Sequence, residues 1–104
     1  MATDADLRPL IFAHSHVLVK FADKTCLICQ ALAPKMTALA RDPRFAHVLF
    51  PRIDAGENPV AAQEVRFTRA PFLAACRDAR LEHGETVFTE ARVEEILLQC
   101  LPLS

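Results

Sequence analysis

The stretch that decides the fold is VLVKFADKTCLIC, residues 17–29. Its first six residues are β-rich and mostly apolar, which is typical of a strand covered on both faces. A short polar loop follows at Asp23-Lys24-Thr25, and Cys26 and Cys29 then stand where a helix begins. The stretch therefore predicts a buried strand that leads directly into a helix with two cysteines in its first turn.

The helix that begins at this pair is expected to run from about Cys26 to Arg41. Its apolar positions recur at helical spacing and form one stripe, to which Cys29 belongs. Pro34 lies inside the helix and should kink it, because proline donates no N–H to the helix and clashes with the preceding turn. Asp42-Pro43 ends it.

The remaining chain alternates between helix and strand patterns. A short first helix is expected with Asp6 as its N-cap and its end near residues 14–16. Downstream we expect a strand at 47–53 that Pro51 weakens, followed by a short helix at 60–65 that Asn58 caps and in which Pro59 takes the first position. A strand at 72–76 and a turn at 77–80 lead to a strand around Leu81 that Gly84 breaks. The last helix is capped by Thr89 and stopped by Pro102. This order predicts an α/β sandwich around one central sheet.

Composition narrows the classes of function. The 104 residues fit a single domain, residues 1–104, and 52% hydrophobic content supplies a real core. A formal net charge of −1 gives no sign of nucleic-acid or lipid-surface binding. The apolar runs are far shorter than a bilayer span, and the acidic first six residues do not resemble a secretory signal. We therefore expect a cytoplasmic protein, monomeric, with no nucleic-acid or membrane partner.

The spacing of Cys26 and Cys29 suggests redox chemistry. Two thiols three residues apart on a first helical turn approach closely enough to form a disulfide. The helix N–H groups and dipole favour a thiolate at Cys26, which is the nucleophile in thiol–disulfide exchange, and Lys24 is near enough in sequence to add positive charge. Cys29 lies on the apolar stripe and should be more buried. These positions predict that Cys26 attacks and Cys29 resolves.

The same pair has a structural alternative. A CxxC is also half of a zinc site, but such a site needs two further ligands. Cys76 and Cys100 are isolated in sequence, and we interpret them as small buried hydrophobes rather than as a second redox pair. We predict no metal and no cofactor.

Several motifs together resemble the thioredoxin family over residues 17–101. They are the strand that precedes Cys26-Leu27-Ile28-Cys29, Pro34 in the helix, Ile53-Asp54 with Asn58-Pro59, and Arg69-Ala70-Pro71-Phe72. The resemblance implies a three-layer α/β/α sandwich with a central mixed sheet of about four strands, in which the family's first edge strand is missing. It also implies a cis Pro71 beside the cysteines, with Ala70 facing the substrate.

The sequence departs from the family pattern around the motif. Lys20 stands where the family has a buried acid, and Phe50 stands where it has that acid's lysine partner. A buried Lys20 could stabilise a Cys29 thiolate as a cation or act as a base when neutral. We expect instead that it reaches solvent from a strand edge. Leu27 and Ile28 replace the family's Gly-Pro, and would either form an apolar contact surface for substrate or cover the second thiol.

The resemblance implies a thiol–disulfide oxidoreductase that reduces disulfides of a protein substrate through a Cys26/Cys29 cycle and is recharged by an electron-donating reductase. One alternative is bacilliredoxin-like or glutaredoxin-like reduction of mixed disulfides with a small thiol. Another is a non-enzymatic binding module that uses the groove beside Pro71. Metal binding by the pair in a dimer is a third.

Overall fold

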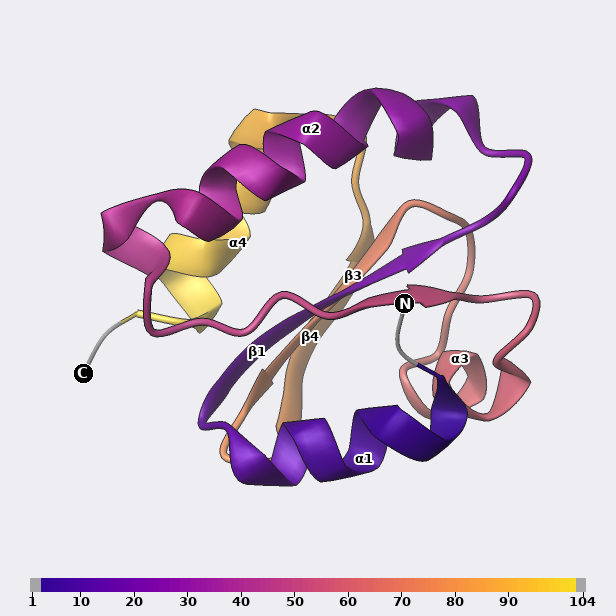
Figure 1. Cartoon of the computed structure of the whole chain (residues 1–104), viewed down its shortest axis with the longest axis horizontal. Helices are drawn as coiled ribbons and strands as arrows, with labels where there is room; N and C mark the ends of the chain where they lie inside the picture. The colour runs from indigo at the N-terminus through magenta and orange to yellow at the C-terminus, as the bar shows by residue number, and fades with distance from the viewer. Residues whose placement is uncertain (1–2, 103–104) are drawn as a thin grey trace.

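A computed structural model describes residues 3–102 of the chain. Its elements, shown in Figure 1, are α1 (Asp4–Ala13), β1 (His16–Ala22), α2 (Leu27–Arg41), the short 3-10 turn η1 (Pro43–Phe45), β2 (Arg52–Asp54), α3 (Pro59–Glu64), β3 (Phe72–Arg77), β4 (Arg80–Thr86) and α4 (Glu90–Cys100). No helix in this part of the chain is both long and apolar enough to cross a membrane.

The four strands form one mixed sheet in the order β2-β1-β3-β4. β1 pairs in parallel with β2 and antiparallel with β3, and β3 pairs antiparallel with β4. This confirms the predicted four-stranded sheet, to which residues 3–102 add no further edge strand. As a result β1 lies in the interior of the sheet and β2 forms its edge.

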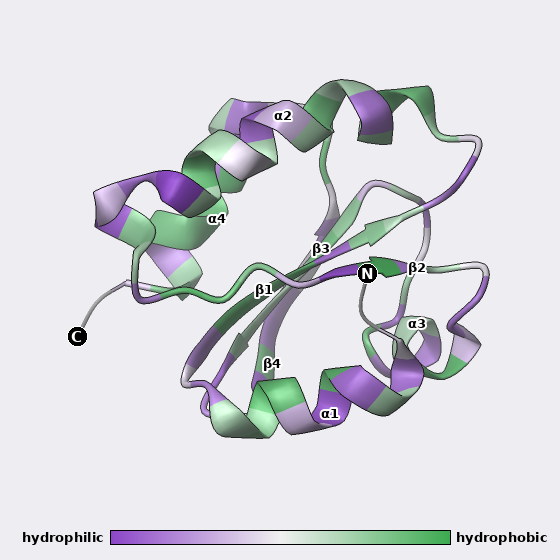
Figure 2. Cartoon of the chain, viewed as in Figure 1, coloured by the Kyte–Doolittle hydropathy of each residue, from purple (hydrophilic) through white to green (hydrophobic). Residues whose placement is uncertain are grey.

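Helices cover both faces of the sheet, with α2 and α4 on one side and α1 and α3 on the other (Figure 1). Hydrophobic residues run along β1 in the middle of the sheet (Figure 2). Successive side chains of a strand point to opposite faces. Leu18 accordingly joins the core under α2 and α4, whereas Val17, Val19 and Phe21 join the core over α1 and α3. The predicted three-layer sandwich is confirmed.

The first helix begins earlier than predicted. Its N-cap is Thr3 rather than Asp6, and the Thr3 N–H and hydroxyl both donate to the Asp6 carboxylate, at 3.2 and 3.0 Å. The prediction of Asp6 as the cap was therefore wrong. Asp6 instead lies in the first turn, where a carboxylate stabilises the helix dipole.

The strand predicted at residues 47–53 is shorter in the structure, where β2 is only Arg52–Asp54. The preceding segment still follows β1, because Leu49 forms an isolated bridge with Val17 and the Lys20 N–H donates to the Pro51 carbonyl at 2.9 Å. Pro51 has no N–H for a regular ladder, which explains why the strand is interrupted there.

Asn58 is the N-cap residue of α3, as predicted, but its side chain does not cap the helix. The amide of Asn58 donates to the Asp54 carbonyl, at 2.9 Å, and accepts from the Asp4 N–H, at 2.8 Å. The Asp4 carboxylate accepts the N–H of Ala61 at 2.8 Å instead. Asp4, which lies 57 positions before Ala61 in the sequence, therefore caps this helix.

Gly84 does not break the fourth strand, contrary to the prediction. β4 continues through it to Thr86, and Gly84 pairs with Ala74 of β3. A Cβ at position 84 would lie 2.9 Å from the tip of the Phe72 ring. Glycine is needed here because the neighbouring aromatic ring approaches its backbone closely.

The two helices that matter most for the site agree with the prediction. α2 covers Leu27–Arg41, passes through Pro34, and buries Cys29, Leu32, Met36 and Leu39. α4 begins after Thr89, whose hydroxyl accepts the Arg92 N–H at 3.3 Å.

Candidate active site

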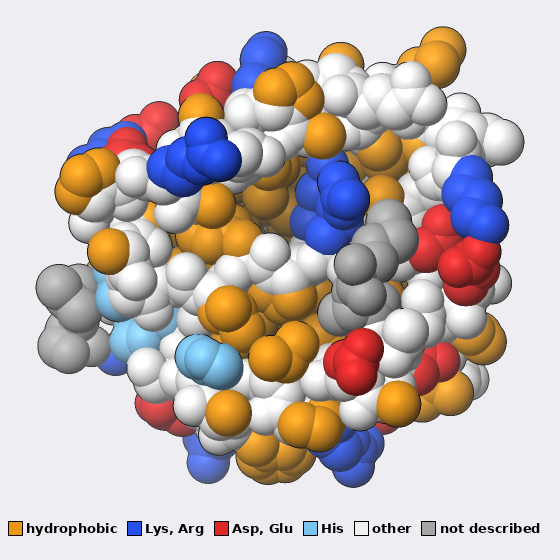
Figure 3. All heavy atoms as spheres, viewed as in Figure 1, with side chains coloured by type: hydrophobic (Ala, Val, Ile, Leu, Met, Phe, Trp, Pro, Cys, Tyr) orange, Lys and Arg blue, Asp and Glu red, His pale blue; other side chains and the backbone are white. Residues whose placement is uncertain are grey.

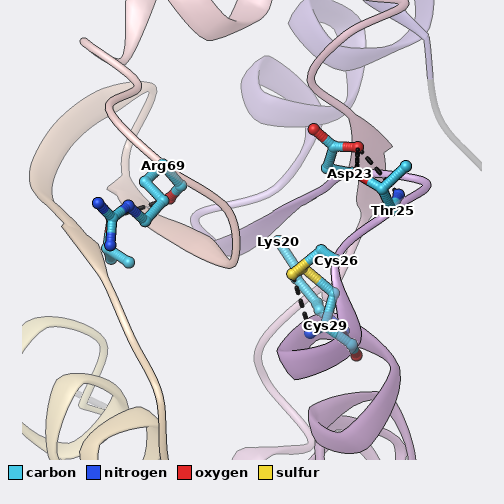
Figure 4. The surroundings of a disulfide bond; sticks show 7 residues. Lys20, Asp23, Thr25, Cys26, Cys29 and Arg69 are labelled. Atoms are coloured by element: carbon cyan, nitrogen blue, oxygen red, sulfur yellow. Dashed lines mark hydrogen bonds between the residues drawn. A yellow bond between two sulfur atoms is a disulfide. The ribbon is translucent and has the colours of Figure 1, made fainter.

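Cys26 and Cys29 are joined in a disulfide at the start of α2, with their Cα atoms 5.2 Å apart (Figure 4). Cys26 is the N-cap residue of the helix, and its Sγ accepts the backbone N–H of Cys29 at 3.0 Å. Helix N-termini carry partial positive charge from unsatisfied N–H groups. The Cys26 sulfur is thus placed where a thiolate would be stabilised when the pair is reduced.

The two cysteines differ in burial. Cys29 is only 4% exposed, whereas Cys26 is half-buried. The greater burial of Cys29 that the apolar stripe predicts is confirmed. Cys26 is therefore the more accessible residue of the pair.

The loop between β1 and α2 is held by Asp23. Its carboxylate accepts the N–H and the hydroxyl of Thr25, at 3.1 and 3.2 Å, and its carbonyl accepts the Cys26 N–H at 3.1 Å. These bonds form a short Asx-type turn. They direct the chain from the end of the strand into the N-terminus of α2 (Figure 4).

Lys24 is exposed and forms an ion pair with Glu57, from the loop before α3. Glu57 raises the pKa of Lys24, so the ammonium stays charged. The predicted contribution of this charge to Cys26 is offset, because an adjacent carboxylate largely neutralises the field of the lysine. Glu57 lies 33 residues away from Lys24 in the chain, so no local sequence pattern links the two side chains.

Lys20 is buried, which overturns the expectation that it reaches solvent from a strand edge. It is 4% exposed and lies on β1, between β2 and β3. Its Nζ donates to the backbone carbonyl of Cys29 at 3.2 Å. Figure 4 shows Lys20 beside the cysteine pair. Burial lowers the pKa of Lys20, and the nearby positive charge of Arg52 lowers it further. The side chain therefore lies directly beneath the turn that carries the disulfide.

The loop before β3 contains the Ala70–Pro71 peptide bond, which is cis. The end of β4 holds this loop in place: the Val87 N–H donates to the Pro71 carbonyl at 2.9 Å, and the Thr86 hydroxyl donates to the Arg69 carbonyl at 2.8 Å. β1 and β3 pair Phe21 with Phe72. The cis bond is thus at the same end of the sheet from which β1 leads to Cys26.

Leu27 and Ile28 are strongly exposed for apolar residues, at 76% and 43%. They lie on the first turn of α2, next to the disulfide. Of the two expectations for them, an apolar contact surface fits Leu27, because so little of its side chain packs against the protein.

The other two cysteines are not paired. Cys76 is buried in β3, and burial raises the pKa of its thiol to about 11. Cys100 is half-buried, and burial raises its pKa as well. A raised pKa favours the protonated, less nucleophilic form of both thiols, as expected for structural cysteines. Among residues 3–102, no group of three or more His, Cys, Asp or Glu side chains is arranged to hold a metal ion.

Arg52 is a neighbour of the site that no local sequence pattern marks. β1 and β2 place Arg52 directly opposite Lys20 in parallel register. The only sequence signal for its position is that Arg52 immediately precedes Ile53-Asp54. The register between β1 and β2 brings the positive charges of Lys20 and Arg52 together.

Several solved structures share this fold. The thioredoxin of Fasciola hepatica is 28% identical, with 95% of each chain covered and a TM-score of 0.86. A mutant thioredoxin of Halobacterium salinarum NRC-1 is 20% identical, with 100% of this chain and 98% of the other covered and a TM-score of 0.83. A thioredoxin of Plasmodium falciparum is 14% identical, with 95% of each chain covered and a TM-score of 0.87. No curated protein matches the chain in sequence.

The mixed sheet flanked by two helical layers, with a cysteine pair at the N-terminus of α2, defines a thiol–disulfide oxidoreductase of the thioredoxin fold. The thioredoxin family model matches residues 2–101. The chain belongs to the thioredoxin family.

Proposed function

We propose that this protein reduces disulfide bonds of protein substrates, with Cys26 as the nucleophile and Cys29 as the resolving thiol. The observation that carries the proposal is the position of Cys26. Its half-buried sulfur caps the N-terminus of α2 and accepts a backbone N–H, while Cys29 is buried behind it. One accessible and one buried thiol is the arrangement that a two-step exchange requires.

In the proposed cycle the Cys26 thiolate attacks one sulfur of the substrate disulfide. The substrate S–S bond breaks, one substrate sulfur leaves as a thiolate, and a mixed disulfide forms at Cys26. Cys29 loses its proton and attacks the Cys26 sulfur, which releases the second substrate thiolate and closes the Cys26–Cys29 disulfide. Two electrons pass from the protein to the substrate, whose two thiolates take up protons. A partner reductase returns two electrons, and no bound cofactor is needed.

The surface around the pair supports a protein substrate rather than a small thiol. The exposed Leu27 offers apolar area next to Cys26. The loop at the cis Ala70–Pro71 bond lies at the same end of the sheet and is fixed by Thr86 and Val87. We infer that an extended substrate segment lies along Ala70 and Pro71 while its apolar side chains contact Leu27 and Ile28.

The direction of the exchange depends on the compartment, because cytosolic glutathione and thioredoxin systems keep dithiols reduced. We therefore propose a cytoplasmic setting, in which the pair is kept reduced and acts as an electron donor.

A trapping experiment tests this proposal. The full chain is equilibrated in dithiothreitol redox buffers, free thiols are alkylated, and the mass is read, because the chain has neither Trp nor Tyr for fluorescence. We expect a reversible Cys26–Cys29 disulfide. Cys29→Ser, mixed with a disulfide-bonded protein such as insulin, should accumulate a covalent complex, and Cys26→Ser should form none.

Two outcomes would contradict the proposal. Failure of the wild-type chain to form the Cys26–Cys29 disulfide would favour a non-enzymatic binding module. A Cys29→Ser variant that captures glutathione but no protein would favour reduction of small-thiol mixed disulfides.

A further inference from the structure

A hollow of about 350 Å³ opens beside the site, between α2 and the β1–β2 edge of the sheet. Its apolar lining comes from both sides and consists of Leu18, Ala33, Met36, Ala40, Phe50 and Pro51. Figure 3 shows Lys and Arg side chains around a hollow with hydrophobic atoms at its base, on the face below α2. A volume of this order suits a small organic ligand.

The charged lining is of one sign. Among residues 3–102, Lys20, Arg41 and Arg52 line the hollow, and no Asp or Glu does. Within residues 3–102, neither Arg41 nor Arg52 forms an ion pair or a side-chain hydrogen bond. Lys20 and Arg52 are register partners on adjacent parallel strands, so their side chains lie on the same face of the sheet. Like charges placed side by side repel each other unless an anion lies between them.

Lys20 also keeps donors available for a ligand. An ammonium group has three N–H donors. One donates to the Cys29 carbonyl at 3.2 Å, and it is the single hydrogen bond of the Lys20 side chain in the described part of the protein. Burial and Arg52 both lower the pKa of Lys20, and an anion in the hollow would oppose that effect.

We propose that this hollow binds a small organic carboxylate with an apolar tail. Lys20 and Arg52 hold the carboxylate at the inner end, Arg41 adds charge at the α2 side, and the tail packs on the apolar lining. The two guanidinium groups suit the carboxylate because a guanidinium can donate two parallel hydrogen bonds to it. The site does not require the disulfide cycle, although Lys20 connects it to the backbone of Cys29.

Calorimetric titration of the oxidised full chain with octanoate tests the proposal. We expect saturable binding of one octanoate, weakened by about tenfold or more in Arg52→Gln and in Arg41→Gln, since each removes a charge-assisted hydrogen-bond donor. Both arginines are exposed, so these variants should fold normally. Arg80→Gln is the matched control, because Arg80 is an exposed arginine of β4 outside the hollow.

Two further probes separate the contributions of the charge and of the apolar tail to binding. Octanol has the tail without the charge, and inorganic phosphate has charge without the tail, so each should bind at least about tenfold more weakly than octanoate. The proposal is overturned if octanoate does not bind, if the two arginine variants bind it as the wild type does, or if octanol or phosphate matches it. A failure of disulfide reduction would leave this titration unchanged.

Discussion

Lys20 is the residue that most distinguishes this site. A lysine at a buried position of a central strand loses hydration, and no carboxylate of the described residues lines the hollow in which it lies. Its hydrogen bond to the Cys29 carbonyl places a donor under Cys29, the proposed resolving thiol, at a position where the thioredoxin resemblance implies an acid. When protonated it favours a negative charge nearby, whereas an acid would disfavour one.

We predict that Lys20→Met slows alkylation of reduced Cys29 at neutral pH by roughly three- to tenfold and moves its pH profile to higher pH. Removing a positive neighbour destabilises the thiolate, so more alkaline solution is needed to form it. Alkylation followed by mass measurement over a pH series gives the result. Lys35→Met, at an exposed position of α2, the helix that contains Cys29, is the control and should leave the profile unchanged. An unaltered Cys29 profile in Lys20→Met would rule out an electrostatic role for Lys20.

At the scale of elements, strand β4 shapes the site from a distance. Its Gly84 makes room for the Phe72 ring, which follows Pro71 and packs edge-on against Phe21 and Phe67. The same strand ends at Thr86, whose hydroxyl bonds the Arg69 carbonyl. The cis-Pro71 loop is thus supported through contacts between β3 and β4.

Gly84→Ala should destabilise the protein by about 1–2 kcal/mol, because the new methyl group overpacks against a buried ring. The relief of glycine's backbone entropy partly offsets this cost. Gly56→Ala is the comparison: its Cβ would lie 3.3 Å from the Asp54 carboxylate in an exposed loop, and it should cost less. Urea unfolding of both variants measures the difference, and equal midpoints would contradict the proposed close packing at Gly84.

At the scale of the whole molecule, a charged cluster connects the sheet to the α2–α4 layer. Glu85 of β4 accepts two hydrogen bonds from Arg92 of α4, at 2.6 and 2.7 Å. His83 contributes a third contact at 2.7 Å. Chiefly through the bonds from Arg92, the pKa of Glu85 falls to about 2.

This low pKa makes stability depend on pH. Glu85 is ionised in the folded protein and has an ordinary value of 4.5 when the chain unfolds. Its contribution is therefore present above pH 4.5 and is lost as the pH falls toward 2. We predict that Glu85→Gln lowers the urea midpoint at pH 7 and lowers it less at pH 3. Glu95→Gln, which removes a more exposed partner of Arg92, should change little at either pH. Equal losses at both pH values for Glu85→Gln would show that the ion pair does not set this dependence.

The sequence alone determined the elements whose signals are local. The apolar run of β1, the stripe of α2, the Thr89 cap and the position of Cys26 at a helix start all follow from patterns within about fifteen residues, and the structure agrees with each. Local periodicity suffices there because burial of one face and capping of one end are decided by neighbours in the chain. The four-stranded sheet followed from the resemblance of these elements to a known family.

Only the tertiary structure decided how distant residues meet. Asp4 caps α3, and Glu57 forms an ion pair with Lys24. The ring of Phe72 lies so close to residue 84 that only glycine fits there. Lys20 looked like a residue of a strand edge, yet sheet order places it inside and strand register sets it against Arg52. Register and burial depend on pairing between segments far apart in sequence, so the patterns of a single segment do not carry that information. The chemistry of the cysteine pair was readable in a single short stretch of sequence, and its electrostatic surroundings were not.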